Sequence, residues 1–242
     1  MTAPWIIDAH LHFGPPGAFF SARPSPADLD AHRRLREDSG GRFRFLAPFD
    51  PRRADASLRD AADAAAGPGL CGLKLHPTVH GTAANDPAYE PAWRFAADHG
   101  LPIFVHSWSV SHYNPSQRLS TPEQFAPFAR AFPAVKLVLG HAGGRGTGRR
   151  EAVRMAAELP NVYVDISGDI FGYRLIEGLV AAAGPHKVLF GSDWPWFDPR
   201  CRLSHVLLAD VDDAAKRRIL RDNAAAVFGE PAEGPSPEDP TC

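Results

Sequence analysis

The stretch Pro102-Ile103-Phe104-Val105-His106-Ser107 is a short apolar run that ends in polar residues. Such a run is typical of a strand that is buried on both faces of a parallel sheet. Six other runs share this form, and helix-like stretches separate them. The seven predicted strands are 5–12, 43–49, 72–76, 103–106, 135–141, 162–167 and 188–193. The predicted helices are 27–37, 54–66, 88–99, 123–131, 149–158, 174–183 and 214–228.

Successive predicted strands end 26 to 37 residues apart. A spacing of about 30 residues is that of the repeating strand–helix unit in a parallel α/β fold. No change in composition marks a domain boundary, so we expect a single domain over residues 1–229. Residues 230–242 are rich in proline and in small and acidic residues, and we expect them to form a disordered tail.

The composition limits the class of protein. Of the 242 residues, 44% are hydrophobic and 22% are charged, as in an average globular domain, which excludes a fibrous or wholly disordered chain. A formal net charge of -2 gives no basic surface for phosphates, so nucleic acid is not an expected partner. No apolar run approaches the roughly 20 residues that cross a bilayer, and the first residues lack the pattern of a signal peptide. Three cysteines without a CxxC pair favour a reducing compartment, and we expect a cytoplasmic protein with no membrane partner.

Polar side chains gather at the ends of the predicted strands. Five strands from all parts of the chain end in this way, at His10 and His12, Lys74 and His76, His106, His141, and Asp193. In parallel α/β folds, ligands and catalytic groups lie at the carboxyl ends of the strands. The sequence therefore places the candidate site at these ends.

His10 and His12 alternate along one strand, so both side chains lie on one face. Two adjacent buried imidazoles repel each other when charged, and a shared divalent metal ion takes up both lone pairs. The alternative is a hydrogen-bonded pair of core histidines. His106 and His141, taken singly, are each compatible with a metal site or with a hydrogen-bonded core position. Asp193 follows an apolar strand and needs a cation or hydrogen-bond donors, because a buried unpaired carboxylate is costly.

Four motifs carry a resemblance to a known family: Ile7-Asp8-Ala9-His10-Leu11-His12, Gly72-Leu73-Lys74-Leu75-His76-Pro77, Leu139-Gly140-His141-Ala142-Gly143 and Phe190-Gly191-Ser192-Asp193-Trp194-Pro195. Residues 219–224 and 227–229 look like that family's last helix. In order and spacing, the motifs resemble the metal-dependent amidohydrolase superfamily, and within it amidohydrolase family 2, over nearly the whole chain. The resemblance implies a (β/α) barrel that acts on a small-molecule substrate.

The resemblance also implies a set of metal ligands. His10, His12, His106 and Asp193 would hold one divalent ion, and His141 would be either a further ligand or the acid–base residue beside it. Three imidazoles and a carboxylate suit zinc, with manganese or iron as alternatives, and leave a position for a water whose pKa falls toward about 7. Asp193 would also take a proton from that water, so the predicted catalytic residues are His141 and Asp193.

The predicted substrate-binding residues are Lys74, His76, Trp108, Arg145 and Trp194. In binuclear members of the superfamily, a carboxylated lysine at the position of Lys74 bridges two metal ions. The alternative is a free amine that pairs with Asp8 or with the substrate. Arg145 lies in a glycine-rich loop that lacks the pattern of a phosphate-binding loop, and we expect it to face an anionic group of the substrate. Trp108 and Trp194 would line the site with aromatic surface.

One strand–helix unit is missing from the eight that the family usually has. The 37 residues from His12 to Phe49 hold one predicted helix and one predicted strand, which leaves no room for a second unit. We expect a distorted TIM-like barrel of seven evident parallel strands, either open or filled by the apolar stretch 15–22. An exposed sheet edge favours pairing with another subunit, so a homodimer is also expected.

Together these observations favour a hydrolase in which a metal-bound water attacks the amide, lactone or ester carbonyl of a small molecule. The alternative is a metal-dependent decarboxylase of an aromatic or unsaturated carboxylate, in which His141 or Asp193 would deliver a proton to carbon. A third hypothesis is a non-catalytic binding protein that has kept the barrel, and the intact ligand set argues against it. Release of CO₂ would separate the first two hypotheses.

Overall fold

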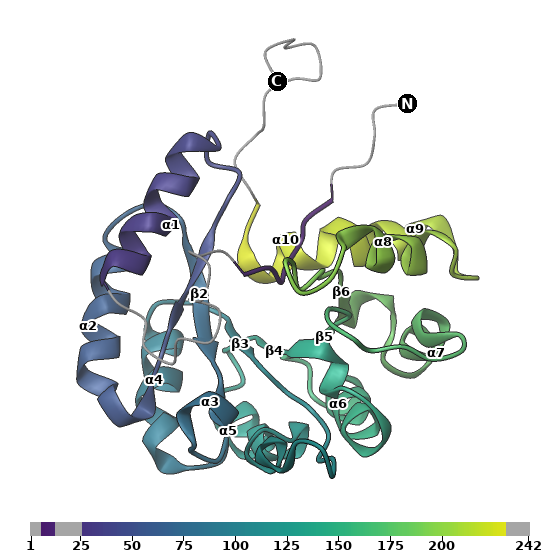
Figure 1. Cartoon of the computed structure of the whole chain (residues 1–242), viewed down its shortest axis with the longest axis horizontal. Helices are drawn as coiled ribbons and strands as arrows, with labels where there is room; N and C mark the ends of the chain where they lie inside the picture. The colour runs from purple at the N-terminus through teal and green to yellow at the C-terminus, as the bar shows by residue number, and fades with distance from the viewer. Residues whose placement is uncertain (1–5, 13–25, 231–242) are drawn as a thin grey trace.

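A computed structural model of the chain describes residues 6–12 and 26–230. Figure 1 shows the strands at the centre, with the helices arranged around them. The expected plug at 15–22 lies outside the described residues, as does the expected tail from residue 231 onward.

Six parallel strands form one sheet, in the order in which they occur in the sequence. They are β1 (Phe45–Pro48), β2 (Leu70–Leu75), β3 (Ile103–Val105), β4 (Leu137–Leu139), β5 (Val162–Asp165) and β6 (Val188–Leu189). The register pairs Lys74 with Phe104 and Phe104 with Val138, so these three side chains point to the same face. The predicted parallel α/β fold is confirmed.

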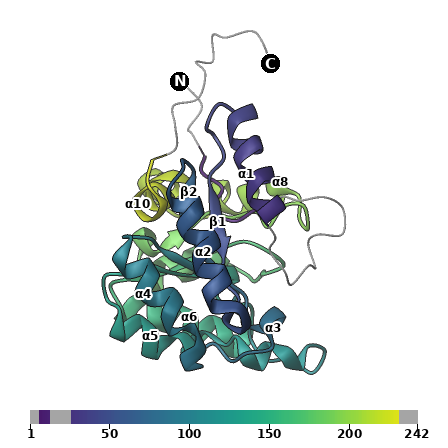
Figure 2. The same cartoon turned by 90° about the vertical axis from the view of Figure 1, so that its left-hand side faces the viewer.

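Helices connect successive strands and cover the outer face of the sheet. They are α1 (Pro26–Asp38), α2 (Ala54–Ala65), α3 (Pro77–His80), α4 (Glu90–Asp98), α5 (Ala126–Ala131), α6 (Gly146–Glu158), α7 (Leu175–Ala183), α8 (Pro199–Leu207), α9 (Asp213–Arg217) and α10 (Asn223–Phe228). Figure 2 shows α2 in front of β1 and β2, the two strands that it connects.

The N-terminal segment, residues 6–12, was expected to be a seventh strand, but it is not a strand of this sheet. It runs beside the end of β6 and shares one isolated parallel bridge, between Leu11 and Trp194. The backbone N–H of Asp193 donates to His10 O (2.7 Å). Regular pairing stops here because Asp193 has a left-handed backbone conformation (φ 64°), outside the extended region that a ladder requires. The segment keeps its predicted place in the barrel without a regular ladder.

The predicted helix 214–228 is interrupted. A π-helical turn, Arg218–Asp222, separates α9 from α10. Such a turn releases backbone carbonyl groups from the regular helical pattern. Here Ile219 O accepts a hydrogen bond from Phe190 N (2.8 Å), and Leu220 O accepts one from Ile7 N (2.9 Å). The irregular turn therefore holds both β6 and the N-terminal segment.

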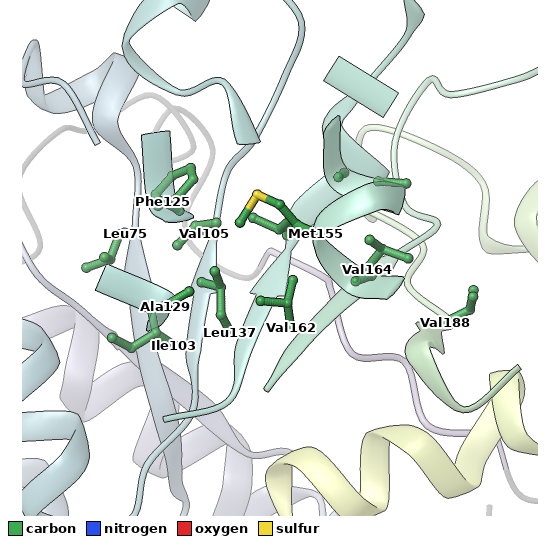
Figure 3. Close-up of a cluster of buried hydrophobic side chains, with 14 of the residues drawn as sticks. Leu75, Ile103, Val105, Phe125, Ala129, Leu137, Met155, Val162, Val164 and Val188 are labelled. Atoms are coloured by element: carbon green, nitrogen blue, oxygen red, sulfur yellow. The ribbon is translucent and has the colours of Figure 1, made fainter. Parts of the chain in front are cut away.

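Side chains on the two faces of the strands belong to different cores. Ile103 and Val105 point outward into the larger core, between the sheet and the helices (Figure 3). Phe104 points the other way, into a smaller core that it shares with Val138 and Leu189. Phe228 of α10 stacks on Phe104 with ring centroids 6.5 Å apart. The last helix thus packs against the interior of the barrel.

The missing unit is visible in the order of the elements. Between the N-terminal segment and β1, the described residues contain α1 but no strand. Among the described strands, β1 has one neighbour, β2, and no strand pairs with its other edge. The homodimer that an open edge favours stays a prediction. No helix in the described ranges is long and apolar enough to span a membrane. The cytoplasmic location also stays a prediction.

Candidate active site

The site lies where the strands end in polar residues. His10 and His12 come from the N-terminal segment, Lys74 from β2, and Asp193 from the turn after β6. His141 follows β4, where its backbone is left-handed (φ 58°). Non-glycine residues rarely adopt this conformation, and they concentrate at functional sites.

Three of the predicted metal ligands converge. His10 Nε2 lies 3.2 Å from His12 Nε2 and 3.6 Å from Asp193 Oδ1. His12 Nε2 lies 3.2 Å from Asp193 Oδ1, which closes the triangle. Burial, with Lys74 nearby, lowers the pKa of His10 well below 6.5, so its imidazole is neutral and keeps a lone pair. Ligands about 2.1 Å from a tetrahedral zinc ion are about 3.4 Å apart, so these three donors fit one divalent ion.

A second group of donors lies on the other side of His10 and consists of His10, His141 and Asp165. Asp165 Oδ2 is 3.2 Å from His10 Nδ1. The Ser167 hydroxyl lies 2.6 Å from His10 Nδ1 and 3.0 Å from His141 Nδ1. Burial raises the pKa of Asp165, while His141 and Ser167 lower it in part. His10 thus connects the predicted metal ligands to a buried carboxylate and a hydroxyl.

Asp165 and Ser167 are the residues that the sequence analysis missed. The strand 162–167 was predicted, and its last residues are polar like those of the other strands. The same argument that selected five strand ends therefore applied to this one.

His106 belongs to neither group of donors among the described residues. Its Nε2 lies 3.1 Å from Gln117 Oε1, and its ring stacks on His76 with centroids 4.2 Å apart. Burial lowers the pKa of His106 to about 4. Its ring centroid is 5.0 Å from that of His141, so His106 lies edge-on against His141. Its predicted role as a ligand stays a prediction.

Lys74 lies against the metal triangle. Its Nζ is 3.4 Å from His10 Nε2 and 4.2 Å from the centroid of the Phe104 ring. Burial lowers the pKa of Lys74 to about 8, opposed in part by the carboxylates of Asp165 and Asp193. The pairing with Asp8 that we considered is not found, since the Asp8 carboxylate accepts backbone N–H groups instead.

Trp108 packs against two histidines of the site, and its predicted role in lining a substrate stays a prediction. The Trp108 ring lies edge-on to His141 with centroids 5.3 Å apart, and it stacks on His106 at 6.3 Å. A Cβ at Gly144 would come within 2.6 Å of the Trp108 ring, so this glycine leaves room for the indole. Trp194 is 42% exposed, directly after Asp193.

Arg145 is already partnered at the rim. Its guanidinium forms an ion pair with Asp169 (2.5 Å) and lies over the Phe171 ring, 4.2 Å from the centroid. Both charged groups are about half exposed, so the pair is open to solvent and to exchange with another anion. The predicted contact between Arg145 and an anionic substrate therefore requires Arg145 to leave Asp169.

Fold and site together define an α/β barrel with a cluster of imidazole and carboxylate donors at the carboxyl ends of its strands. Residues 27–229 match the family model described as amidohydrolase. This match covers well over half of the chain, and the chain therefore belongs to the amidohydrolase family, as the motifs predicted. The match begins after His10 and His12, so their assignment rests on the geometry. No curated protein matches the chain in sequence.

Solved structures share the fold at low sequence identity. An uncharacterized TIM-barrel protein from Bordetella bronchiseptica has a TM-score of 0.69 and 19% identity, over 84% of this chain and 71% of that chain. 2,6-Dihydroxybenzoate decarboxylase from Rhizobium has a TM-score of 0.66 and 16% identity, over 88% and 81%. Dihydroxybenzoic acid decarboxylase from Polaromonas sp. JS666, with bound manganese and the inhibitor 2-nitroresorcinol, has a TM-score of 0.61 and 18% identity, over 84% and 74%. The predicted TIM-like barrel is confirmed.

Proposed function

We propose that this protein is a metal-dependent hydrolase that cleaves the amide, lactone or ester bond of a small molecule. The observation that carries the proposal is the triangle of His10 Nε2, His12 Nε2 and Asp193 Oδ1, with sides of 3.2 to 3.6 Å. Two imidazoles and a carboxylate that converge in this way would hold one divalent ion, and zinc is the metal that this donor set favours. Bound there, zinc would supply a Lewis acid that acidifies water.

The remaining groups have roles that follow from their positions. The Asp193 carboxylate has a second oxygen that can accept a proton from an attacking water. His141, at the edge of the cluster, can polarise the substrate carbonyl or protonate the leaving group. The Lys74 ammonium, 3.4 Å from His10 Nε2, gives the site a positive charge that favours an anionic substrate. Trp108 supplies a flat apolar surface beside His141.

A decarboxylase is the second candidate function. The specific observation in its favour is that two of the structures with this fold are decarboxylases of dihydroxybenzoates. A buried Lys74 and the indole of Trp108 would suit an aromatic carboxylate as well as they suit an ester. In that reaction, His141 or Asp193 would deliver the proton that replaces CO₂ on carbon.

The metal assignment is tested first by stoichiometry. Purified protein is stripped with a chelator and titrated with zinc or manganese, and we expect one ion per chain. His12→Ala and Asp193→Asn should bind at least tenfold more weakly, because each removes one donor of the triangle. His186→Ala, at an exposed histidine outside the site, is the matched control. His106→Ala should weaken metal binding if His106 is a fourth ligand. It should leave metal binding unchanged if His106 only lines the site.

The reaction class is tested with the metal-loaded enzyme. A panel of lactones, aryl esters, amides and hydroxybenzoates is followed for acid release and for CO₂. Hydrolysis incorporates solvent oxygen into the product and releases no CO₂, whereas CO₂ from a hydroxybenzoate would support the second candidate. Native protein without stoichiometric metal, together with a His12→Ala variant that binds metal equally well, would reject the metal site.

A further inference from the structure

The carboxylate of Asp165 is held as a hydrogen-bond acceptor. Asp165 ends β5 and its side chain is fully buried. Its Oδ1 accepts the backbone N–H of His141, and its Oδ2 accepts that of Ser167 (3.3 Å). Because each oxygen already faces an N–H donor, the carboxylate presents only lone pairs to its remaining neighbour. That neighbour is His10 Nδ1, 3.2 Å from Oδ2.

Ser167 joins the two histidines through one hydroxyl group. Its Oγ lies 2.6 Å from His10 Nδ1 and 3.0 Å from His141 Nδ1. A hydroxyl has one hydrogen to donate, together with lone pairs to accept. When it donates this hydrogen to one imidazole nitrogen, it can bond to the other only as an acceptor, so that second nitrogen must carry a proton. A hydroxyl bonded to both rings in this way gives the two facing nitrogens opposite protonation states.

Asp165 decides the direction of this link. Its lone pairs require a proton on His10 Nδ1, so His10 keeps the lone pair of Nε2, which faces His12 and Asp193. Ser167 then donates to His141 Nδ1, and the His141 proton lies on Nε2. The carbonyl oxygen of Ser167, 3.3 Å from His141 Nδ1, would favour the opposite tautomer, but the hydroxyl is closer.

Two glycines leave space for this arrangement. A Cβ at Gly191 would lie 2.4 Å from Asp165 Oδ2 and 2.8 Å from the Cβ of His10. A Cβ at Gly168, whose φ is +78°, would lie 2.6 Å from His141 Nδ1. Any larger residue at position 191 would displace the carboxylate or the imidazole. The carboxylate and both rings are therefore fixed by packing as well as by hydrogen bonds.

We propose that Asp165 and Ser167 are positioning residues that set the tautomers of His10 and His141 in opposite senses, so that His10 offers a lone pair to a metal ion and His141 offers an N–H to the substrate. The metal part of this statement rests on the proposed function. Neither residue needs to touch the metal or the substrate, since both act through the far nitrogen of a histidine ring.

The tautomers are measured directly in metal-free protein. Long-range ¹H–¹⁵N spectra of protein labelled at histidine distinguish a ring nitrogen that carries a proton from one with a lone pair. We expect the proton on Nδ1 of His10 and on Nε2 of His141. In Asp165→Asn, the amide group must turn its NH₂ toward one of the two backbone N–H groups, so the carboxamide has one acceptor fewer. We expect the share of His10 with a proton on Nδ1 to fall.

Ser167→Ala is the second variant, and it should change the His141 tautomer while His10 keeps its own through Asp165. Asp50→Asn and Ser57→Ala are matched controls, because both residues are buried and neither contacts the site histidines through a hydrogen bond. Gly191→Ala displaces the carboxylate without removing it, and it should reproduce the His10 effect of Asp165→Asn. Far-ultraviolet circular dichroism checks that each variant is folded.

Zinc competition against a chelating dye supplies an independent measurement. Asp165→Asn should bind zinc about 10- to 100-fold more weakly than the wild type. Ser167→Ala should lose less, and the two controls should be unchanged. The positioning role is overturned if Asp165→Asn and Gly191→Ala leave both tautomers as in the wild type, whatever the zinc affinity. If wild-type protein does not bind zinc, the proposed function fails, and the tautomers still test the positioning role.

Discussion

Replacement of Phe104 by alanine should affect stability and metal binding together. The ring is fully buried in the smaller core, inside the barrel. It lies edge-on to His10 with ring centroids 4.6 Å apart, and the Lys74 ammonium lies 4.2 Å from its centroid. Removal of a buried phenylalanine ring costs about 4 kcal/mol of folding free energy, and loss of a buried contact between a cation and a ring costs about 1 kcal/mol more. We therefore expect Phe104→Ala to lower the free energy of unfolding by about 5 kcal/mol.

Phe125→Ala is the matched control for this prediction. Phe125 is also fully buried, but it lies in the larger core, between the sheet and the helices. Phe125→Ala should lower the free energy of unfolding by about 4 kcal/mol and leave the affinity for zinc unchanged. Phe104→Ala should also lower the affinity for zinc about tenfold, because the His10 ring loses the phenyl ring that packs against it.

The assay is urea unfolding with the metal-free protein, followed by zinc competition. A double-mutant cycle with Lys74→Met isolates the contact between the ammonium and the ring, for which we expect about 1 kcal/mol of coupling. Equal losses of stability in Phe104→Ala and Phe125→Ala, with unchanged zinc affinity in both, would refute the view that Phe104 supports the site.

Three further predictions concern pH, the ion pair of Arg145 and a glycine near the start of α6. Burial lowers the pKa of His80 from 6.5 to about 4, so only the unfolded chain takes up this proton between those values. The free energy of unfolding should therefore fall by up to about 3 kcal/mol as the pH falls through that window. His80→Asn, unlike the exposed His112→Asn, should flatten the pH profile of urea unfolding, and an unchanged slope would contradict this assignment. Arg145→Gln should change the free energy of unfolding by less than about 1 kcal/mol, since its ion pair is half exposed, but should raise the KM of an anionic substrate several-fold; an unchanged KM would remove Arg145 from the substrate site. A Cβ at Gly148, near the start of α6, would lie 2.2 Å from the backbone oxygen of Gly143, so Gly148→Ala should lower the thermal midpoint by more than the equivalent of about 1 kcal/mol. Gly178→Ala, in α7, places its methyl group in open space and should raise the midpoint. Equal midpoints in the two variants would argue against close packing of Gly148 on Gly143.

The sequence predicted the six strands of the sheet because each contains a short apolar run. The run Ile103-Phe104-Val105 is β3, and the neighbouring β4 is an apolar run of the same length, whereas β2 is longer and contains Lys74. Helix α8 was not predicted, although Asp198 before Pro199 is a helix start signal that the structure uses, since Asp198 accepts from Arg200 N (2.9 Å). The sequence there has no clear apolar periodicity, which is the signal on which the helices were assigned.

The site was predicted less completely than the fold. Residue type and position at a strand end were enough to select His10, His12 and Asp193, which converge. They were not enough to predict the direction of a side chain. His106 has the right place in the sequence, but its ring turns to Gln117. That hydrogen bond depends on a partner 11 residues away, in the short 3-10 helix Pro115–Leu119, which no pattern in the sequence of the strand specifies.

The bonding of the N-terminal segment has a consequence for how the site is assembled. A strand inside a closed barrel is held from both sides, whereas in the described part of the chain the N-terminal segment is bonded to the end of β6 and to the π-turn, and to no strand on its other side. Local opening of this segment should therefore require less free energy than global unfolding, and it would carry His10 and His12 away together. The apparent affinity for a metal ion is then the intrinsic affinity reduced by the fraction of molecules in which the segment is docked. A substitution such as Ile7→Ala, which touches no ligand, would weaken metal binding simply by lowering that fraction.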